Sequence, residues 1–243
     1  MGAIQKKEGH LVESSAALHQ MIREFTNCNT VSVDGSSRTK VDIRTDLNIN
    51  FSHKFASNSN TQVYLPTLKS WNEKIPMPDS VRNKLSLFLG DHNWNMDEIE
   101  KQIGTQLGSE EKRRHRVHSL NIDGFSEVTD WMNQHLRELL ILMVRELDPS
   151  DPVHYIIWSE KNKNTSTIVD VNKFIDYVSN NCKWTALDTT FEIRDPATGK
   201  RLFHLQMKGS GKKTGDYHNP MFHIHNNWPA GTVLEERNDF NIR

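Results

Sequence analysis

The stretch Thr45-Asp46-Leu47-Asn48-Ile49-Asn50-Phe51, followed after a loop by Gln62-Val63-Tyr64-Leu65-Pro66-Thr67-Leu68-Lys69, decides the fold that we expect for this chain. Both segments have the pattern of β-strands, and the polar residues 52–60 between them are typical of a loop. Asp46 opens the first strand and Lys69 closes the second, so pairing of the strands would bring the two side chains together at one end of a sheet. A carboxylate and an ammonium group placed in that way can hold a divalent cation and orient a water molecule.

The elements around this hairpin predict a mixed α/β fold. Apolar residues at helical spacing indicate helices over residues 12–25, 80–89 and 126–147. Strands are expected over residues 31–33, 41–51, 62–69 and 153–158. The last of these is a nearly continuous apolar run, as in a strand that is covered on both faces. The order helix, three strands, helices, strand therefore predicts an αβββαβ core built on a mixed sheet.

The C-terminal part of the chain predicts a β-hairpin. Residues 189–194 and 201–207 flank Asp195-Pro196-Ala197-Thr198-Gly199, in which proline and glycine favour a turn, and residues 221–225 form a last strand. The polar run Lys161-Asn162-Lys163-Asn164-Thr165 indicates an exposed boundary near residue 160. We therefore expect two domains, a core of residues 1–160 and a second lobe of residues 161–243.

Composition excludes several classes of protein. The 243 residues hold 30 Lys and Arg against 31 Asp and Glu, so a basic surface can only be local, as in residues 112–116 and 194–213. Cys28 and Cys182 are the only cysteines, which excludes a disulfide framework or a four-cysteine zinc site and indicates a reducing cytoplasm. No apolar segment is long enough to span a membrane, and no phosphate-binding or dinucleotide-binding glycine motif predicts a nucleotide cofactor.

These residues resemble the PD-(D/E)xK nuclease superfamily, and within it the type II restriction endonucleases. The resemblance lies in Glu13 on the first helix, Thr45-Asp46, Thr67-Leu68-Lys69 and the C-terminal hairpin that runs into residues 205–211. It implies a restriction-endonuclease-like catalytic core over residues 1–160 and a DNA-recognition lobe over residues 161–243. It also implies Mg²⁺-dependent hydrolysis of phosphodiester bonds in double-stranded DNA, with Asp46 binding metal and Lys69 near the water.

The chain departs from the family motif at one position. The second acid should precede the lysine by two residues, and Thr67 stands there. A threonine hydroxyl is neutral and binds a hard cation more weakly than a carboxylate does. Asp42, expected on the same strand face as Asp46, could supply the missing charge as a second metal ligand, and Glu13 could do so from the helix.

A second hairpin leaves an alternative open. Asp188 opens one of its strands and Gln206-Met207-Lys208 closes the other, which is also compatible with the catalytic motif. If this hairpin is not catalytic, it suits base reading, because a two-stranded ribbon enters the major groove, where glutamine pairs with adenine and arginine or lysine with guanine. The residues expected to contact DNA are Arg194, Arg201, His204, Gln206, Lys208, Lys212, Lys213 and His223.

The function that we expect is that of a cytoplasmic type II restriction endonuclease that acts on double-stranded DNA with Mg²⁺. A two-fold dimer would suit palindromic sites. Two alternatives remain open at this stage. One is a DNA-binding protein without cleavage, in which Thr67 marks a lost acid. The other is a repair nuclease that selects DNA by its structure.

Overall fold

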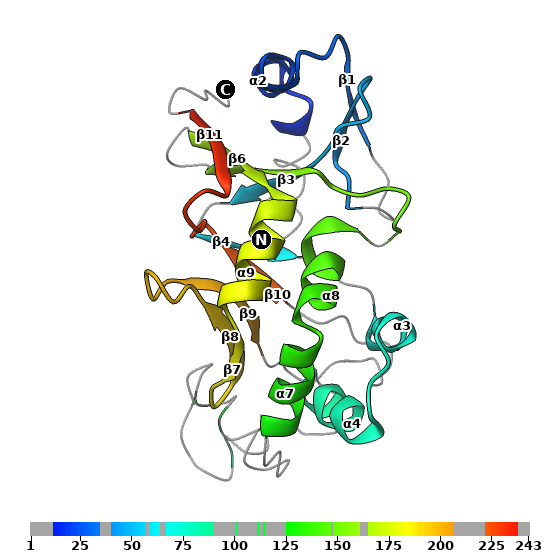
Figure 1. The fold of residues 1–243 in the computed structure, drawn as a ribbon, viewed down its shortest axis with the longest axis vertical. Coiled ribbons are helices and arrows are strands. Elements are labelled where there is room, and N and C mark those ends of the chain that lie inside the picture. The colour runs from blue at the N-terminus through cyan, green and yellow to red at the C-terminus, as the bar shows by residue number, and fades with distance from the viewer. Residues whose placement is uncertain are drawn as a thin grey trace. The chain divides into compact units, whose positions relative to one another are not determined.

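The computed structural model describes residues 12–34, 40–56, 59–63, 67–89, 101, 111, 114, 125–146, 148–160, 165–206 and 222–237. The chain forms two compact units (Figure 1). The first unit is drawn from Met1–Thr61, Leu140–Asn181 and Ile224–Arg243, and the second from Gln62–Leu139 and Cys182–His223. No helix among the described residues is long and apolar enough to cross a membrane.

A six-stranded mixed sheet organises the first unit. Its strands follow the order β1 (Val31–Val33), β2 (Ile43–Thr45), β3 (Asn50–Ala56), β5 (Tyr155–Glu160), β6 (Thr165–Asp170) and β11 (Val233–Arg237). β3 and β5 pair in parallel, whereas the other neighbours pair antiparallel. Because β3 and β5 are parallel, the chain between them must return to the same end of the sheet before β5 begins. The second unit takes up most of that connection.

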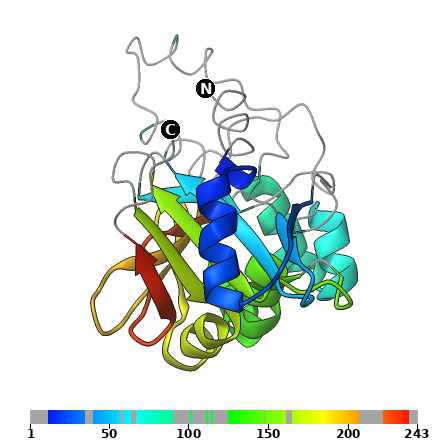
Figure 2. The same cartoon turned by 90° about the horizontal axis from the view of Figure 1, so that it is seen from above.

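Helix α2 (Ala16–Thr26) lies across one face of this sheet, as Figure 2 shows. Ser15 caps its first turn by accepting a hydrogen bond from the Leu18 N–H at 3.3 Å. Asn27 ends it in the left-handed conformation that favours a helix C-terminus. Leu18, Met21 and Ile22 recur on one side of the helix and are buried against apolar side chains of β2, β3, β5 and β6.

The opposite face of the sheet packs on an aromatic cluster. The Trp228 ring contacts Trp158 of β5, with ring centroids 5.8 Å apart, and Phe174 of α9 (Val171–Asn181), with centroids 5.3 Å apart. A π-helical segment, η1 (Ile141–Arg145), precedes β5. The middle of β5 is thus covered on both faces, as expected for a strand in the centre of a sheet.

The second unit combines helices with the larger part of a five-stranded sheet. The helices are α3 (Leu68–Lys74), α4 (Asp79–Phe88), α7 (Ser126–Gln134) and α8 (Leu136–Leu140). The strands follow the order β4 (Asn60–Val63), β10 (Phe222–His225), β9 (Arg201–Gln206), β8 (Thr190–Arg194) and β7 (Trp184–Ala186). Aromatic rings from helices and strands fill its core, including Phe88, Phe125 and Phe191.

The fold confirms the predicted α/β class and the mixed sheet. The order differs at one point, because four strands, β1 to β4, and not three, lie between α2 and the helices α3 and α4. The C-terminal hairpin is also confirmed, since β8 and β9 pair antiparallel across a turn in which Gly199 has a positive φ of 69°. The expected boundary at residue 160 lies between β5 and β6, which pair with each other in the first unit. The division into a catalytic core and a recognition lobe at that residue stays a prediction.

The predicted pairing of residues 41–51 with residues 62–69 is wrong. Thr45 ends β2, and a tight turn, in which Asn48 has a positive φ of 57°, leads directly into β3, so β2 and β3 form the hairpin. β4 ends at Val63. Lys69 lies in α3, because the Thr67 hydroxyl accepts a hydrogen bond from the Ser70 N–H and begins a helix there. The expected helix over residues 126–147 is divided into α7, α8 and η1.

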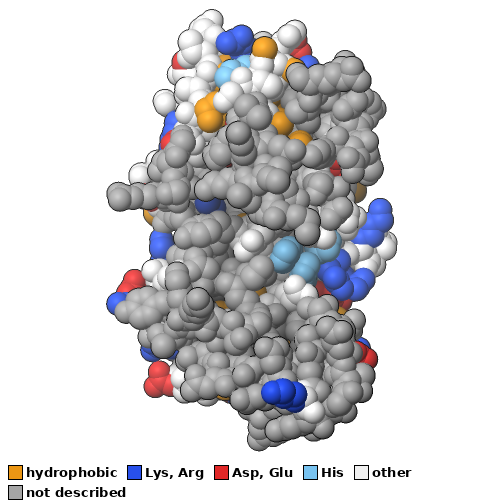
Figure 3. Space-filling view, turned by 180° about the vertical axis from the view of Figure 1, so that it is seen from behind, with side chains coloured by type: hydrophobic (Ala, Val, Ile, Leu, Met, Phe, Trp, Pro, Cys, Tyr) orange, Lys and Arg blue, Asp and Glu red, His pale blue; other side chains and the backbone are white. Residues whose placement is uncertain are grey.

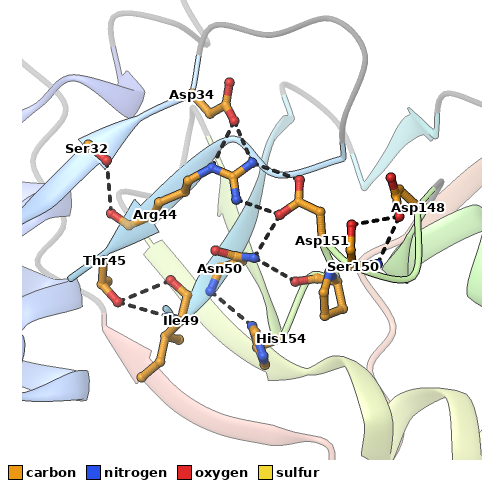
Figure 4. Close-up of polar contacts among 11 residues, drawn as sticks. Ser32, Asp34, Arg44, Thr45, Ile49, Asn50, Asp148, Ser150, Asp151 and His154 are labelled. Carbon is orange, nitrogen blue, oxygen red and sulfur yellow. Dashed lines mark hydrogen bonds and ion pairs between the residues drawn. The ribbon is translucent and has the colours of Figure 1, made fainter. Parts of the chain in front are cut away.

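Arg44 joins three segments of the first unit (Figure 4). Its guanidinium donates hydrogen bonds to Asp34 at 2.7 and 2.9 Å and to Asp151 at 2.5 and 2.8 Å. Asn50 of β3 also donates to Asp151, at 3.2 Å, and to the Pro152 carbonyl at 3.0 Å. These bonds, first to Asp151 and then to Asp34, raise the pKa of Arg44 above its ordinary value. The segment that leads into β5 is thereby attached to β2 and β3.

Replacement of Arg44 should destabilise the first unit. Arg44→Met removes the charged hydrogen bonds to both carboxylates, and because the arginine is about a third exposed we expect a loss of about 2 kcal/mol in the free energy of unfolding. Arg44→Lys keeps the charge but cannot bridge both carboxylates with a planar group, so it should lie between wild type and Arg44→Met. Urea unfolding measures all three proteins.

The matched control is Lys84→Met, which removes an ion pair with Glu127 whose side chains are 30% and 44% exposed. Exposed pairs of this kind contribute about 0.5 kcal/mol or less. An Arg44→Met protein as stable as wild type would contradict the role of Arg44.

His154 should make the first unit sensitive to acid. Its Nδ1 accepts a hydrogen bond from the Asn50 N–H at 3.0 Å, which requires a neutral ring. Burial, and secondarily the charge of Arg145, lower the pKa of His154 below 6.5. The folded state therefore binds fewer protons than the unfolded state, so stability is complete above about pH 6.5 and falls as the pH drops below it.

His154→Asn tests this pH dependence, because an amide oxygen can accept the same hydrogen bond without titrating. Urea midpoints measured at several pH values between about 5 and 8 should fall less steeply with acid in the variant than in wild type. Identical slopes would show that another group is responsible.

Candidate functional site

Asp42, Ser52 and Lys54 meet on one face of the β2–β3 hairpin. The Ser52 hydroxyl donates to Asp42 Oδ2 at 3.0 Å, and the His53 backbone N–H donates to the same oxygen at 2.7 Å. Lys54 Nζ lies 2.5 Å from Ser52 Oγ and 3.5 Å from Asp42 Oδ2. The side chains of Asp42 and Lys54 are 30% and 23% exposed, so the cluster is open to solvent on one side.

The register of the hairpin produces this cluster. Ile43 of β2 is paired with Phe51 of β3, which places Asp42 opposite Ser52. Successive side chains of a strand point to opposite faces, so Ser52 and Lys54 share one face while Phe51 and His53 share the other. The Phe51 face is packed against α2. The face that carries Asp42, Ser52 and Lys54 therefore points away from α2.

The chemistry of this cluster suits a hard divalent cation. Lys54 Nζ is close to three kinds of oxygen: the Asp42 carboxylate, the Ser52 hydroxyl and, at 3.4 Å, the His53 backbone carbonyl. Carboxylate, hydroxyl and carbonyl oxygens are also the protein ligands of Mg²⁺. Asp42 is the single carboxylate of the three, and the described residues contain no group of three or more His, Cys, Asp or Glu side chains that could hold a metal. Water and phosphate oxygens would have to complete such a site.

Lys40 adds a second amine near the cluster. Burial and, to a smaller extent, the charge of Lys54 lower the pKa of Lys40, and Asp42 raises it, so that the net pKa is about 7. A substantial fraction of Lys40 is therefore neutral at neutral pH. A neutral Lys40 does not repel the charged ammonium group of Lys54.

Glu13 and His53 form a separate, buried line of polar groups on the α2 face. His53 Nε2 lies 3.0 Å from Ser159 Oγ, which lies 2.8 Å from Ser166 Oγ. Glu13 Oε1 lies 3.7 Å from His53 Nδ1. All four residues are buried. Glu13 thus meets the ring of His53 on the opposite side of β3 from Lys54, and the structure does not bring it to Asp42.

The structure gives the other predicted catalytic residues different surroundings. The Asp46 carboxylate accepts hydrogen bonds from the Asn29 backbone N–H at 3.2 and 3.3 Å and so holds the turn after β2 against the segment after α2. The three residues of β2 separate it from Asp42, a distance of about 13 Å along an extended chain. Thr67 is a helix cap and Lys69 lies on α3 in the second unit. The premise that Asp46 and Lys69 close one hairpin is therefore wrong.

Ser52, His53 and Lys54 were not among the residues expected from the sequence, where residues 52–60 were predicted to form a loop. The signal for them is Asp42 followed ten residues later by Ser-x-Lys, a sequence compatible with the expected motif if serine stands in the place of the second acid. It was hidden because residues 41–51 had the alternation of one continuous strand. The turn at Asn48 is what brings Asp42 back to Ser52.

The second hairpin gathers polar residues on one face of the second unit. Glu192 is 4% exposed and accepts hydrogen bonds from Arg194 at 2.5 Å and from Arg201 at 2.6 Å. Burial raises the pKa of Glu192, but the two arginines outweigh burial and the net pKa lies below its ordinary value. The rings of His204 and His223 are stacked, with centroids 4.5 Å apart and planes 7° apart. Burial lowers the pKa of His223.

A recess of about 420 Å³ opens on this face, and its lining includes Arg114, Asp188, Thr190, Arg201, His204 and Gln206. Histidine side chains gather beside Lys and Arg side chains in the view of Figure 3. Three of the residues expected to contact DNA, namely Arg201, His204 and Gln206, thus line one recess. Lys208, Lys212 and Lys213 lie outside the described residues, so the alternative motif of Asp188, Gln206 and Lys208 is described only at its first two members.

No model of a known protein family matches the chain, and no characterised protein matches it in sequence. Among solved structures, the chain is similar to the restriction endonuclease MspI in a crystal structure of its complex with its cognate DNA. The match covers 87% of this chain and 80% of that chain, with 9% sequence identity and a TM-score of 0.36. A likeness at this level leaves the activity to be decided by the residues of this chain.

Proposed function

We propose that the protein is a Mg²⁺-dependent nuclease of the type II restriction endonuclease kind, with its active centre at Asp42, Ser52 and Lys54. One observation carries the proposal. An antiparallel hairpin places an aspartate opposite a Ser-x-Lys sequence, with Lys54 Nζ 3.5 Å from Asp42 Oδ2. The hairpin belongs to a mixed sheet in which β3 pairs in parallel with β5, the arrangement expected for the αβββαβ core of the PD-(D/E)xK superfamily.

Each residue of the cluster has a distinct role in this proposal. Asp42, the Ser52 hydroxyl and the His53 carbonyl would hold the cation, which when bound supplies Lewis-acid polarisation of the phosphate and a more acidic water. Lys54 donates hydrogen bonds to a phosphate oxygen and stabilises the negative charge that develops as water attacks phosphorus. The His53 N–H fixes the Asp42 carboxylate by its 2.7 Å hydrogen bond. The partly exposed side of the cluster admits the DNA backbone.

In this proposal double-stranded DNA is the partner, and the polar face of the second unit reads its sequence. Arg201, His204 and Gln206 contribute donors and acceptors that suit base edges in the major groove. A two-fold dimer remains the expected assembly for a palindromic site.

A second candidate function is sequence-specific DNA binding without cleavage. Ser52 favours it, because a hydroxyl stands where the family motif has its second acid, and a site with one carboxylate binds Mg²⁺ more weakly than a site with two. This reading predicts tight, sequence-dependent binding of duplex DNA that Mg²⁺ does not convert into cleavage. A repair nuclease, in contrast, would cut branched DNA without sequence preference.

Digestion of a fully sequenced, unmethylated phage DNA tests the proposal. The wild-type protein should give discrete bands in Mg²⁺ and none in EDTA. Asp42→Asn and Lys54→Met should each reduce the cleavage rate about 100-fold or more, because each removes a group that acts on the reacting phosphate or its cation. Both variants should still bind the DNA. Asp42→Asn keeps an amide oxygen that can accept from Ser52 and His53, which limits damage to the fold.

The matched controls are Asp46→Asn and Lys69→Met. They alter the two residues that the sequence had placed at the active centre, and they should leave cleavage intact. Loss of cleavage in Asp46→Asn with retention in Asp42→Asn would contradict the proposed centre. Loss of cleavage in Asp188→Asn alone, in a protein that still binds the same DNA sequence as wild type, would move the centre to the second hairpin. Uncut DNA that is nevertheless bound in a sequence-dependent way would support the binding protein.

A further inference from the structure

One face of the β8–β9 hairpin is polar and the other is apolar. The register pairs Thr190 with Gln206 and Glu192 with His204, so these four side chains share one face. The alternate residues of both strands are buried in the core of the second unit: Phe191, Ile193, Phe203 and Leu205. The polar face is therefore presented by a rigid scaffold, and the recess lies on that face.

Among the described residues that line the recess, the charges are nearly balanced. Arg201 faces the buried Glu192 carboxylate at 2.6 Å, and Arg114 faces Asp188 at 3.7 Å. Proteins bind DNA phosphates with lysine and arginine side chains that have no carboxylate partner, and the resulting release of counterions from the DNA contributes much of the affinity. A recess in which each arginine has a carboxylate partner is poorly suited to that task. Its mixture of amide, hydroxyl, imidazole, guanidinium and carboxylate groups suits the donors and acceptors of base edges instead.

Asp188 differs from Glu192 in a way that points to a ligand. The Glu192 side chain is 5% exposed and is held by two arginines, whereas the Asp188 side chain is 81% exposed and lines the recess. A carboxylate that faces DNA is repelled by phosphates, so it is favourable only where a hydrogen-bond donor meets it. The exocyclic amino group of cytosine is such a donor in the major groove, and Asp and Glu are its usual partners.

We propose that this recess reads base edges of duplex DNA and that Asp188 determines specificity by accepting a hydrogen bond from the N4 amino group of a cytosine. Gln206, on the same wall, pairs with an adjacent base. The inference rests on the proposed function, since it takes duplex DNA as the substrate. It assigns Asp188 to recognition and not to catalysis.

Selection from a pool of random-sequence duplexes tests the assignment. Binding is selected in EDTA, so that no duplex is cleaved, and bound molecules are sequenced for wild type, Asp188→Asn and Glu73→Gln. Glu73 is an exposed acid on α3 and is the matched control for loss of one negative charge. Wild type and Glu73→Gln should select the same site, with cytosine at one position preferred about 10- to 100-fold.

Asp188→Asn should lose that cytosine preference at the one position, since an amide pairs best with adenine, and should keep the preferences elsewhere. The dependence of its affinity on salt should match that of wild type, because a base contact does not change the number of phosphates bound. Both readouts are independent of cleavage.

Three results would overturn the assignment. Asp188→Asn with an unchanged selected site would exclude base reading by Asp188, and loss of cleavage in that variant would then assign it to the active centre. Uniformly tighter binding of all sequences with a steeper salt dependence would show that Asp188 acts only through its charge. A wild-type protein that binds no duplex DNA would instead contradict the proposed function itself. Failure of the proposed function can thus be distinguished from failure of the role assigned to Asp188.

Discussion

The hydrogen bonds of Arg44 are the constraint on which the first unit depends. The guanidinium binds Asp34 after β1 and Asp151 before β5, while Arg44 itself lies in β2. A parallel pair such as β3 and β5 cannot be closed by a tight turn, and here most of the second unit is inserted between the two strands. Arg44 and Asn50 hold the returning segment at its point of entry. That attachment supports the pairing of β5 beside β3, while the register of β2 with β3 places the Asp42 cluster on the sheet.

Strand β3 connects the buried interior with the candidate active centre. On the α2 face, the ring of His53 is held by Ser159 and lies beside Glu13. On the other face, the backbone N–H of the same residue binds Asp42, and its neighbours Ser52 and Lys54 supply the polar groups. A site built on a central strand that is fixed on both faces is held more precisely than one on a loop. This geometry fits chemistry that depends on the placement of a single carboxylate and a single ammonium group.

Sequence patterns were sufficient for the fold class and insufficient for the register. The helical spacing of Leu18 and Ile22 and the turn at Gly199 predicted α2 and the second hairpin, because each pattern has one simple structural solution. The predicted register of the first hairpin was wrong because Asp46 to Ile49 alternate in polarity as a strand would. The left-handed conformation of Asn48 makes this segment a turn. The predicted place of Lys69 at the end of a strand was wrong because Thr67 caps a helix that begins immediately before Lys69. Asp42 was already a candidate in the sequence, yet its partners Ser52 and Lys54 could be identified only once the pairing of β2 with β3 was known.

The most direct test of the central claim locates the cation itself. With Fe²⁺ in place of Mg²⁺ and ascorbate present, radicals formed at the bound metal cut the polypeptide close to its ligands, and mass spectrometry identifies the cut positions. The proposed centre predicts cuts near residue 42 and near residues 52–54, which disappear in Asp42→Asn and when excess Mg²⁺ competes. Cuts near residues 46 and 69, or near residues 188 and 206, would contradict a centre on the β2–β3 hairpin.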